Sequence, residues 1–373
     1  MKKTILFFLF ILFNTIILNA KIVLVNNEKP QKIVGVQIFN MQKSYKNNLD
    51  YYFSLLKKAG VNTVFIRVFQ NDGDRYHYGI KTSCKHGLYF KSDKACTVYD
   101  ILPEFIRYGK KYGIKIYAWI GTRKLSFLVE KYGKNKTFYL SNNRKREGYG
   151  VDLFSSVIFK ELISIFRELA RYNIDGILLQ DDYILRIDES ASFDALTKYL
   201  IDHDKNLSPN YTFDSLPIDF FTWKKDYLAD LLNRIKWEVK KINPKIKFAV
   251  NIYYETLLDK NKGIKWYGQC IDTYNKLGFK YFASMLYSEQ IKKEMKFDNN
   301  NYLIMLDNIL SVWSNKIYPS YRLIAKLQIR DFKKKVKIDK TFYEKTCRLI
   351  NKYNVSYILV PFEDLADLDY ICK

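Results

Sequence analysis

Short apolar, β-branched segments alternate along this chain with longer segments whose apolar residues recur at helical spacing. Such alternation is typical of parallel β-strands joined by crossover helices. Eight candidate strands follow one another in this way, namely Ile33–Phe39, Thr63–Phe69, Lys115–Ile120, Ile174–Gln180, Phe248–Tyr253, Phe282–Tyr287, Ala325–Ile329 and Ser356–Val360. Three groups show the helical spacing most clearly, namely Leu49, Phe53, Leu56 and Ala59, then Ile158, Leu162, Phe166 and Leu169, and then Leu228, Leu231, Ile235 and Val239.

Four of the predicted helix-to-strand connections carry a residue that tolerates positive φ just after the helix. These residues are Gly60, Gly113, Asn173 and Asn354. A left-handed residue at this position is a common way to end a helix, so we expect positive φ at all four. The repeated order of helix, left-handed residue and strand favours a molecule built from like units.

Eight such units predict a single-domain (β/α)8 TIM barrel over residues 21–373 rather than an open doubly wound sheet. No GxGxxG or P-loop sequence is present, and no linker-like segment interrupts the chain. Active sites of TIM barrels lie at the carboxyl ends of the strands, so the residues that end each strand are the first candidates for function.

The N-terminal residues have the pattern of a secretory signal. Lys2 and Lys3 precede an apolar run from Thr4 to Leu18, and Leu18-Asn19-Ala20 offers a cleavage site. We therefore expect residues 1–20 to be a signal peptide and the protein to be secreted or periplasmic. The alternative is an uncleaved anchor, although the run is short for a membrane span. No later stretch is long and apolar enough, so we expect no membrane span in the mature chain.

The five cysteines would enter an oxidising compartment after export. Cys84 and Cys96 could close one loop, and Cys347 and Cys372 could fix the C-terminus, which would leave Cys270 unpaired. Spacing alone does not determine the pairing. There is no CxxC motif and no Cys/His cluster that would indicate zinc.

The formal net charge is +23. An anionic partner is one explanation, and a bias toward Lys, Asn, Ile and Tyr is the other. We favour the compositional bias, because the basic residues are scattered and no nucleic-acid-binding motif occurs. We therefore expect no nucleic-acid partner.

The end of the fourth predicted strand carries two adjacent carboxylates, Asp181 and Asp182, directly after Gln180. Like charges this close raise the pKa of one partner, which suits a pair that works as acid and anion. A helix cap or a loop pair is the structural alternative.

Other predicted strand ends add polar and aromatic side chains that could bind a ligand. These are Arg67, Asp72, Asn251, Tyr253, Tyr287, Glu289, Gln328 and Arg330, with Tyr89 and Trp119 as aromatic candidates for a groove. Each alone is more often a cap, a salt bridge or a core residue. Asp72-Gly73-Asp74 lacks the rest of a calcium loop and is interpreted as a turn. The three histidines have no metal-binding or triad spacing, so we expect no metal and no cofactor.

At these strand ends the chain resembles the C-terminal glycoside-hydrolase domain of the poly-β-1,6-N-acetylglucosamine N-deacetylases, a hypothetical glycosyl hydrolase 13-like barrel. The most specific segment is Asp175-Gly176-Ile177-Leu178 followed by Asp181-Asp182, which resembles the family's DGILFHDD signature. Further similar segments are Val61–Phe65, Leu88–Phe90, Ile116–Trp119, Asn251–Tyr253, Met285–Tyr287 and Lys326–Asp331. The resemblance covers roughly Val34 to Asp364.

Three differences separate the chain from that family. Gln180 occupies the position of the usual histidine. The deacetylase domain, with its zinc ligands, has no counterpart, so no deacetylase activity is expected. The chain is also very basic, whereas partly deacetylated polyglucosamine is cationic.

The resemblance implies an endo-acting glycoside hydrolase on an amino-sugar polysaccharide, with a polysaccharide export system as its partner. It implies that Asp181 is the essential carboxylate with Asp182 as its partner, and Glu289 is a second candidate for the general acid. Paired carboxylates and a substrate-assisted mechanism both fit. A non-catalytic carbohydrate-binding barrel is the main alternative, and a barrel that binds an anionic polymer through its charge is a further one.

Overall fold

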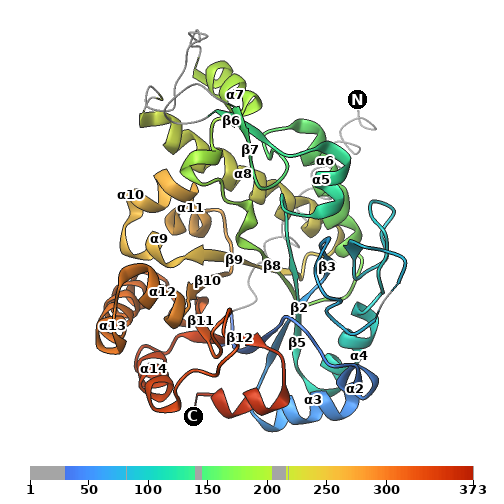
Figure 1. Cartoon of the computed structure of the whole chain (residues 1–373), viewed down its shortest axis with the longest axis vertical. Coiled ribbons are helices and arrows are strands. Elements are labelled where there is room, and N and C mark those ends of the chain that lie inside the picture. The colour runs from blue at the N-terminus through green and yellow to red at the C-terminus, as the bar shows by residue number, and fades with distance from the viewer. Residues whose placement is uncertain (1–29, 81, 139–144, 204–215, 217, 373) are drawn as a thin grey trace, which may run out of the picture.

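Eight parallel strands close into a barrel in the order β1-β12-β11-β10-β9-β8-β5-β2 (Figure 1). The computed structural model describes residues 30–80, 82–138, 145–203, 216 and 218–372. The barrel strands are β1 (Val34–Ile38), β2 (Thr63–Arg67), β5 (Lys115–Ile120), β8 (Gly176–Leu179), β9 (Lys247–Tyr253), β10 (Tyr281–Leu286), β11 (Leu323–Gln328) and β12 (Ser356–Phe362). All eight predicted strands are confirmed, with shifts of a few residues at their ends.

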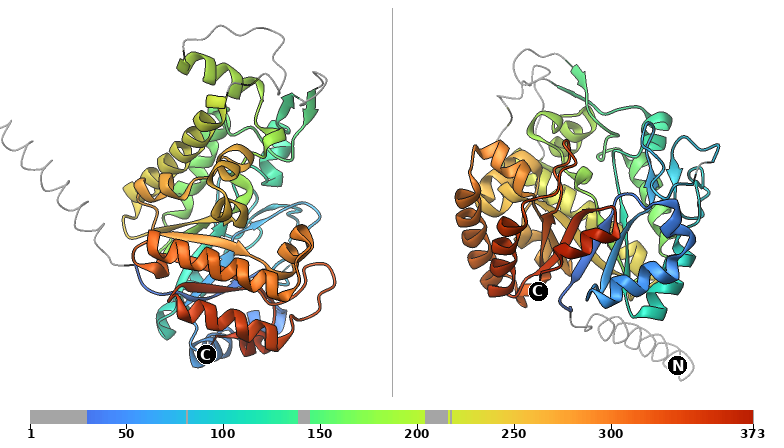
Figure 2. Two further views of the ribbon diagram at one scale, coloured as in Figure 1. Left: turned by 90° about the vertical axis from the view of Figure 1, so that its left-hand side faces the viewer. Right: turned by 60° about the horizontal axis from the view of Figure 1, so that its bottom comes forward.

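Helices surround the barrel on its outside (Figures 1 and 2). The main ones between successive strands are α3 (Leu49–Lys58), α4 (Leu102–Tyr112), α6 (Ser156–Leu169), α8 (Ile218–Ile242), α11 (Ile271–Lys276), α13 (Asn299–Lys316) and α14 (Lys340–Lys352). The three groups of helical spacing in the sequence fall in α3, α6 and α8, except that Ala59 is the C-cap of α3. The prediction of a (β/α)8 barrel is therefore correct.

Shorter elements decorate the connections. They are the helices α2 (Lys43–Asn47), α5 (Ser126–Tyr132), α7 (Phe193–His203), α9 (Tyr254–Leu258), α10 (Lys260–Lys262) and α12 (Ser288–Met295), the π-helical turn η4 (Gly263–Tyr267), and the 3₁₀ turns η1 (Asp181–Tyr183), η2 (Ile187–Glu189), η5 (Ser320–Arg322) and η6 (Leu365–Tyr370). Two small hairpins pair β3 (Phe69–Gln70) with β4 (Gly87–Leu88), and β6 (Lys136–Phe138) with β7 (Lys145–Glu147). Figure 1 places α7 and the β6–β7 hairpin at the end of the molecule opposite α3 and α14.

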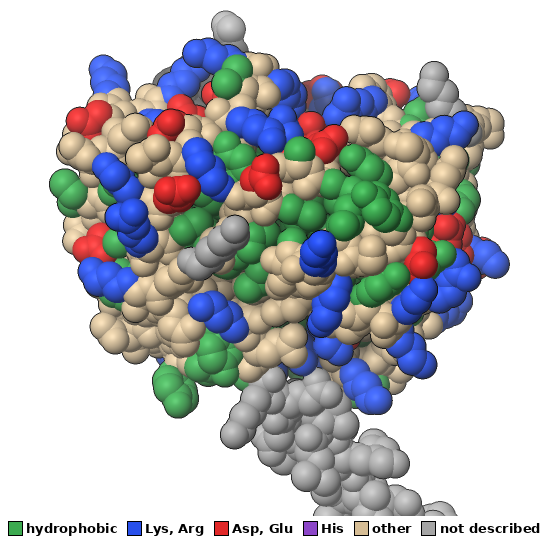
Figure 3. All heavy atoms as spheres, turned by 90° about the horizontal axis from the view of Figure 1, so that it is seen from below, with side chains coloured by type: hydrophobic (Ala, Val, Ile, Leu, Met, Phe, Trp, Pro, Cys, Tyr) green, Lys and Arg blue, Asp and Glu red, His purple; other side chains and the backbone are tan. Residues whose placement is uncertain are grey.

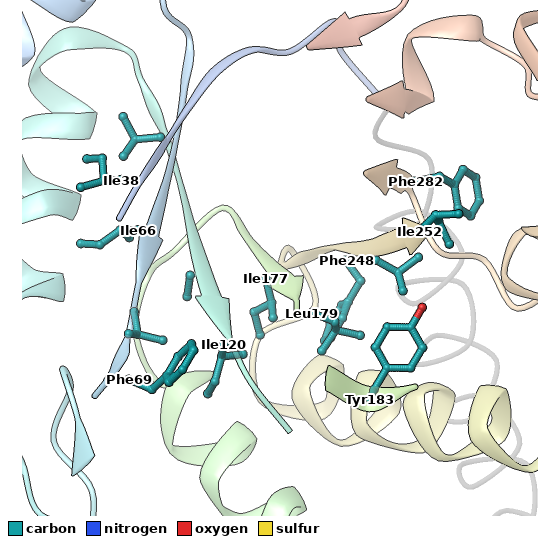
Figure 4. Close-up of a cluster of buried hydrophobic side chains, with 14 of the residues drawn as sticks. Ile38, Ile66, Phe69, Ile120, Ile177, Leu179, Tyr183, Phe248, Ile252 and Phe282 are labelled. Carbon is teal, nitrogen blue, oxygen red and sulfur yellow. The ribbon is translucent and has the colours of Figure 1, made fainter. Parts of the chain in front are cut away.

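Alternation along each strand divides the core into two parts. On β5, Ile116 and Ile120 face the helices, whereas Tyr117 and Trp119 point into the barrel. Successive side chains of a strand point to opposite faces, so each strand supplies both parts. Figure 4 shows the outer part, in which side chains such as Ile120, Ile177 and Phe248 lie together.

Three of the four expected left-handed residues have positive φ, namely Gly60 at 88°, Gly113 at 66° and Asn354 at 50°. The expectation for Asn173 is wrong. After α6 the chain turns through Arg171 and Tyr172, whose N–H groups donate to the carbonyls of Glu168 and Leu169. The reversal is complete before Asn173, which therefore does not need positive φ.

Two disulfides, Cys84–Cys96 and Cys347–Cys372, confirm the pairing that the spacing allowed. Cys270 is buried with a free thiol. The predicted signal segment, residues 1–20, lies outside the described residues. Among the helices described, none has the length and apolar character to cross a membrane.

Candidate active site

A pocket of about 310 Å³ lies at the carboxyl end of the barrel, where TIM-barrel enzymes place their chemistry. Its lining comes from most of the strands and the segments that follow them. The residues are Phe39, Arg67, Trp119, Gln180, Asp181, Arg186, Tyr253, Tyr254, Met285, Tyr287, Gln290, Lys326 and Phe332. Six predicted site residues meet here: Arg67, Trp119, Gln180, Asp181, Tyr253 and Tyr287.

Asp181 supplies the one carboxylate among the described residues that line this pocket. It follows β8 directly and begins the turn η1. The Tyr253 hydroxyl donates a hydrogen bond of 2.9 Å to its Oδ2. Burial, followed by the charge of Asp181, raises the pKa of Tyr253, so the phenol stays protonated and remains a donor. Tyr253 is held in turn by the ring of Tyr267, stacked at 4.4 Å.

Lys326 is a buried cation in the same pocket, 2 % exposed. Its Nζ donates to Asn251 Oδ1 at 3.0 Å. Burial lowers the pKa of the Lys326 ammonium to about 8, and the negative charge of Asp181 acts in the opposite direction. Register alignment puts Lys326 beside Met285 on β10, and Met285 beside Tyr253 on β9. The cation and the Asp181–Tyr253 pair thus face one space.

An aromatic wall forms the opposite side of the pocket. The Trp119 ring lies 4.7 Å from that of Phe39. The Arg67 guanidinium lies over Phe69 at 4.0 Å and Trp119 at 5.5 Å, and is paired with Asp74 at 2.7 Å. Aromatic faces with polar groups beside them are suited to sugar rings, which present C–H and O–H groups together.

Three buried polar atoms of these lining residues have no hydrogen-bond partner within the described residues. They are Arg67 Nε, Trp119 Nε1 and Gln180 Oε1. Buried polar atoms are usually satisfied, so a gathering of unsatisfied ones in one pocket is typical of a ligand site. Two donors and one acceptor match the needs of a polyhydroxylated ligand.

The two adjacent aspartates differ completely in environment. Asp182 is 3 % exposed and accepts hydrogen bonds from Thr122 N, Thr122 Oγ1 and Lys124 N. Gly121 lets this carboxylate approach, since a Cβ there would lie 3.1 Å from Asp182 Oδ2. Burial raises the pKa of Asp182, while the bonds from Lys124 and Thr122 oppose that rise. Asp182 therefore fixes the loop after β5 and does not line the pocket.

The first half of the DGIL segment is structural as well. Asp175 accepts a bond from Ile116 N at 2.9 Å and pairs with Lys115 at 2.9 Å. A Cβ on Gly176 would lie 2.1 Å from the Tyr117 ring, so only glycine allows that ring to fill the barrel.

Several predicted binding residues lie elsewhere. Tyr89 is fully buried, with its hydroxyl bonded to Gln70 Oε1 at 2.7 Å, so it belongs to the core. Asp72 is exposed in the turn around Gly73. Asn251 lies beneath the pocket as the partner of Lys326. Arg330 is tied to the fully buried Asp367.

Glu289 and Gln328 lie in an adjoining groove of about 1090 Å³. Gln328 Oε1 accepts from Glu289 N at 2.8 Å and so caps the start of α12. Glu289 itself pairs with Lys292 at 2.7 Å. Gln290 and Phe332 line both the groove and the pocket, so the two spaces adjoin.

Sequence reasoning missed Lys326, Arg186, Phe39, Tyr254, Met285, Gln290 and Phe332. Lys326 could have been found from the sequence. It occupies a position of a predicted strand whose side chain points into the barrel, where burying a charged group is costly and therefore indicates a functional role. Arg186 and Phe332 lie on connections between elements, whose course is not encoded in any periodicity.

The pocket contains more positive than negative charge. Arg67, Arg186 and Lys326 face one carboxylate, Asp181, although Arg67 is compensated by Asp74 outside the lining. On the wider surface Lys and Arg are spread among acidic and apolar areas, as Figure 3 shows for one face. Among the described residues no group of three His, Cys, Asp or Glu side chains could hold a metal ion.

Comparison with solved structures supports the fold. The PgaB (BpsB) glycoside hydrolase domain from Bordetella bronchiseptica aligns over 89 % of this chain and 94 % of its own, with TM-score 0.70 and 19 % identity. α-L-Fucosidase isoenzyme 2 from Paenibacillus thiaminolyticus aligns over 91 % of this chain and 48 % of its own, with TM-score 0.59 and 14 % identity. The endo-β-1,4-mannanase from Thermotoga petrophila aligns over 90 % and 68 %, with TM-score 0.53 and 12 % identity.

No curated protein sequence matches the chain. The sequence profile described as hypothetical glycosyl hydrolase family 13, in contrast, matches residues 38–358, which includes every strand of the barrel from β2 to β11 and the whole pocket. This chain is therefore a member of hypothetical glycosyl hydrolase family 13, with a glycoside-hydrolase-type barrel.

Proposed function

We propose that this protein is an endo-acting glycoside hydrolase that cleaves an amino-sugar polysaccharide such as poly-β-1,6-N-acetylglucosamine. The observation that carries the proposal is the position of Asp181. It lies at the end of β8 in a pocket with an aromatic wall, and one of its oxygens is already engaged by Tyr253. Family membership supports hydrolysis, and the position of the carboxylate supports its role.

In this proposal Asp181 stabilises the positive charge that develops on the sugar ring during cleavage. The Tyr253 hydroxyl holds the carboxylate in position, and the buried Lys326 ammonium in the same pocket is attracted to its negative charge. Trp119 supports the sugar ring, while Arg67 and Gln180 bind its hydroxyls.

Two routes to cleavage fit this geometry. In the first, Glu289 at the start of the adjoining groove is the general acid and Asp181 the opposing carboxylate. In the second, Asp181 orients the substrate's own N-acetyl group, whose carbonyl oxygen attacks the anomeric carbon as the glycosidic C–O bond breaks, and Glu289 protonates the leaving oxygen; water then opens the oxazolinium ring. The second route needs one orienting carboxylate in the pocket, which is the number among the described lining residues.

The adjoining groove supports internal cleavage. Because Gln290 and Phe332 line both spaces, a chain of sugars could pass from the groove into the pocket. An enzyme that removes terminal sugars would instead need a pocket that is closed behind the last sugar of the chain.

The charge of the pocket bears on which units are accepted. Arg186 and Lys326 would repel a glucosaminium ion, whereas an N-acetylated unit is neutral. We infer that the unit beside Asp181 is acetylated, and that a deacetylated polymer is cut only where acetylated units remain.

The setting of the reaction is part of the proposal. The pattern of residues 1–20 supports secretion or a periplasmic location, and the resemblance to the poly-β-1,6-N-acetylglucosamine N-deacetylases supports action beside a polysaccharide export system. A deacetylase activity is not proposed for this chain.

A non-catalytic carbohydrate-binding barrel is the second candidate. It is favoured by Gln180, an uncharged amide beside Asp181 where the family carries histidine, because an amide cannot exchange a proton at neutral pH. A barrel that binds an anionic polymer is a third candidate, favoured by the cations of the pocket.

Incubation with poly-N-acetylglucosamine, fully acetylated in one sample and partly deacetylated in another, separates these candidates. We expect mass spectrometry to find internal oligosaccharides, with an acetylated residue at each new reducing end. Binding without products would favour the non-catalytic barrel. Binding of a uronate polymer that survives loss of Asp181 but weakens with salt would favour the third candidate.

A further inference from the structure

A second cavity, of about 550 Å³, lies at the opposite end of the barrel from Asp181. It is enclosed by the C-terminal part of α8, the C-terminal end of α11 and the segment that leads into β10. Its lining comprises Asn233, Lys236, Trp237, Lys240, Lys241, Pro244, Lys276, Leu277, Gly278 and Lys280. Nothing in the proposed hydrolase mechanism uses this cavity.

The charge of the cavity is one-sided. Five of its lining residues are lysines and none is acidic. Lys236 is 8 % exposed, and its pKa is lowered to about 8 by burial and then by the charges of Lys240 and Lys280. The positive groups are thus close enough to act on one another.

Lysines at helix C-termini often serve the terminal carbonyl groups, and two of these do. Lys236 donates to the carbonyl of Leu277, and Lys240 donates to that of Pro244 at 2.7 Å. These bonds hold the ammonium groups in position but leave their net charge in place. Glu238, next to Trp237 on α8, is engaged by Arg167 at 3.4 Å and by Lys241 at 2.5 Å, so the charge of Lys241 is compensated.

Trp237 adds an aromatic surface to the cavity, with 54 % of the residue exposed. A large exposed aromatic residue beside several cations is suited to a ligand that combines a ring with an anionic group. The concave shape favours a single sugar unit over the flat surface of a bilayer. We propose that this cavity binds a carboxylate-bearing sugar unit of an acidic polysaccharide, as a second carbohydrate site remote from the Asp181 pocket.

The proposal is tested by titrating the full chain, carrying Asp181→Asn to prevent cleavage, with hexagalacturonate. Binding is followed by calorimetry at two salt concentrations, with neutral maltohexaose as the comparison ligand. We expect hexagalacturonate to bind and maltohexaose not to. The affinity should fall at least about tenfold in Lys240→Ala/Lys280→Ala and in Trp237→Ala, because each change removes part of the site.

Lys57→Ala/Lys58→Ala is the matched control, because it removes two exposed lysines from the C-terminal turn of α3. If the control lost as much affinity for hexagalacturonate as the cavity variants, the binding would be explained by general charge attraction and the proposal would be overturned. Binding that survives both cavity variants would place the ligand elsewhere, for example in the Asp181 pocket. Inorganic phosphate that competes at equal concentration, or binding to phosphatidylglycerol vesicles alone, would also overturn it in favour of a simple anion site or a membrane surface. Each variant is first checked for an unchanged melting temperature.

Discussion

Asp181 and Asp182 are neighbours in sequence but have different roles: Asp181 lines the pocket and Asp182 stabilises a loop. The Asp181 carboxylate lines the pocket and accepts a hydrogen bond from the Tyr253 hydroxyl. The Asp182 carboxylate accepts hydrogen bonds from backbone N–H groups of the loop after β5. Adjacent residues in the turn η1 point in different directions, so a pair of carboxylates in sequence does not become a pair in space. This division is the central feature of the site at the residue scale.

Asp182→Ala is expected to lower the free energy of unfolding by about 2–4 kcal/mol, because Thr122 and Lys124 lose the acceptor for their buried N–H groups. Urea unfolding followed by circular dichroism measures this loss. Asp369→Ala, at an exposed aspartate in η6, should change stability by less than about 0.5 kcal/mol. If Asp182→Ala were as stable as the native chain and yet inactive, Asp182 would have a direct chemical role instead.

Lys326→Met tests the buried cation through the pH dependence of stability. Because burial lowers the folded-state pKa of Lys326 to about 8 from 10.5, the unfolded chain binds more protons between these values. The native chain should therefore gain stability relative to the variant as pH rises from 8 to 10.5, by on the order of 3 kcal/mol. Below pH 8 the difference should be constant. Parallel stability curves over this range would mean that burial does not lower the folded-state pKa of Lys326. A difference that keeps growing with pH below pH 8 would mean that Lys326 is already neutral in the folded state at neutral pH, and its proposed attraction for Asp181 would fail.

At the scale of elements, the strands were predictable and the connections were not. Each barrel strand is apolar on both faces, and a run such as Ile116–Ile120 carries that information locally. The carboxyl end of β8 followed from the same pattern, which is why Asp181 could be singled out. Arg186, Gln290 and Phe332 reach the pocket from connections or a helix start, and no local pattern fixes where such residues lie.

Two predicted binding residues lie outside the pocket for different reasons. Tyr89, in the long connection after β2, is buried in the core, and Arg330, two residues after β11, pairs with Asp367. A residue that closely follows a strand lies at the carboxyl end of the barrel, but this position does not determine whether its side chain points into the pocket. The Gln180 side chain, in contrast, does line the pocket as expected.

Gly176→Ala is the sharpest test of how β8 is packed. The added Cβ would overlap the Tyr117 ring, so we expect destabilisation of about 3 kcal/mol or more, measured by thermal and urea unfolding. The matched control is the same change in a Tyr117→Ala background, where the ring is gone. There Gly176→Ala should cost less than about 1 kcal/mol. Equal costs in both backgrounds would mean that backbone conformation, rather than the ring, requires the glycine.

The whole molecule carries two cross-links that suit an exported protein. Titration of thiols on the denatured, unreduced chain should find one free thiol, Cys270. Replacement of Cys347 and Cys372 by alanine should lower stability by about 3 kcal/mol, and replacement of Cys84 and Cys96 by slightly less, because the loops closed contain 25 and 12 residues. Three or more free thiols in the purified protein would contradict the pairing and weaken the proposal of export.

The barrel brings β8, β9 and β11 close to one another. Asp181, Tyr253 and Lys326 therefore line one pocket, although they lie far apart in sequence. The central claim is that this pocket hydrolyses a glycan and that Asp181 is essential. The most direct measurement is product formation from poly-N-acetylglucosamine by the native chain, Asp181→Asn and the matched exposed variant Asp369→Asn, each with its melting temperature recorded. We predict oligosaccharides from the native chain and from Asp369→Asn, and none from an equally stable Asp181→Asn. Undiminished cleavage by Asp181→Asn would contradict the account and move the search for the catalytic group to Glu289 in the adjoining groove.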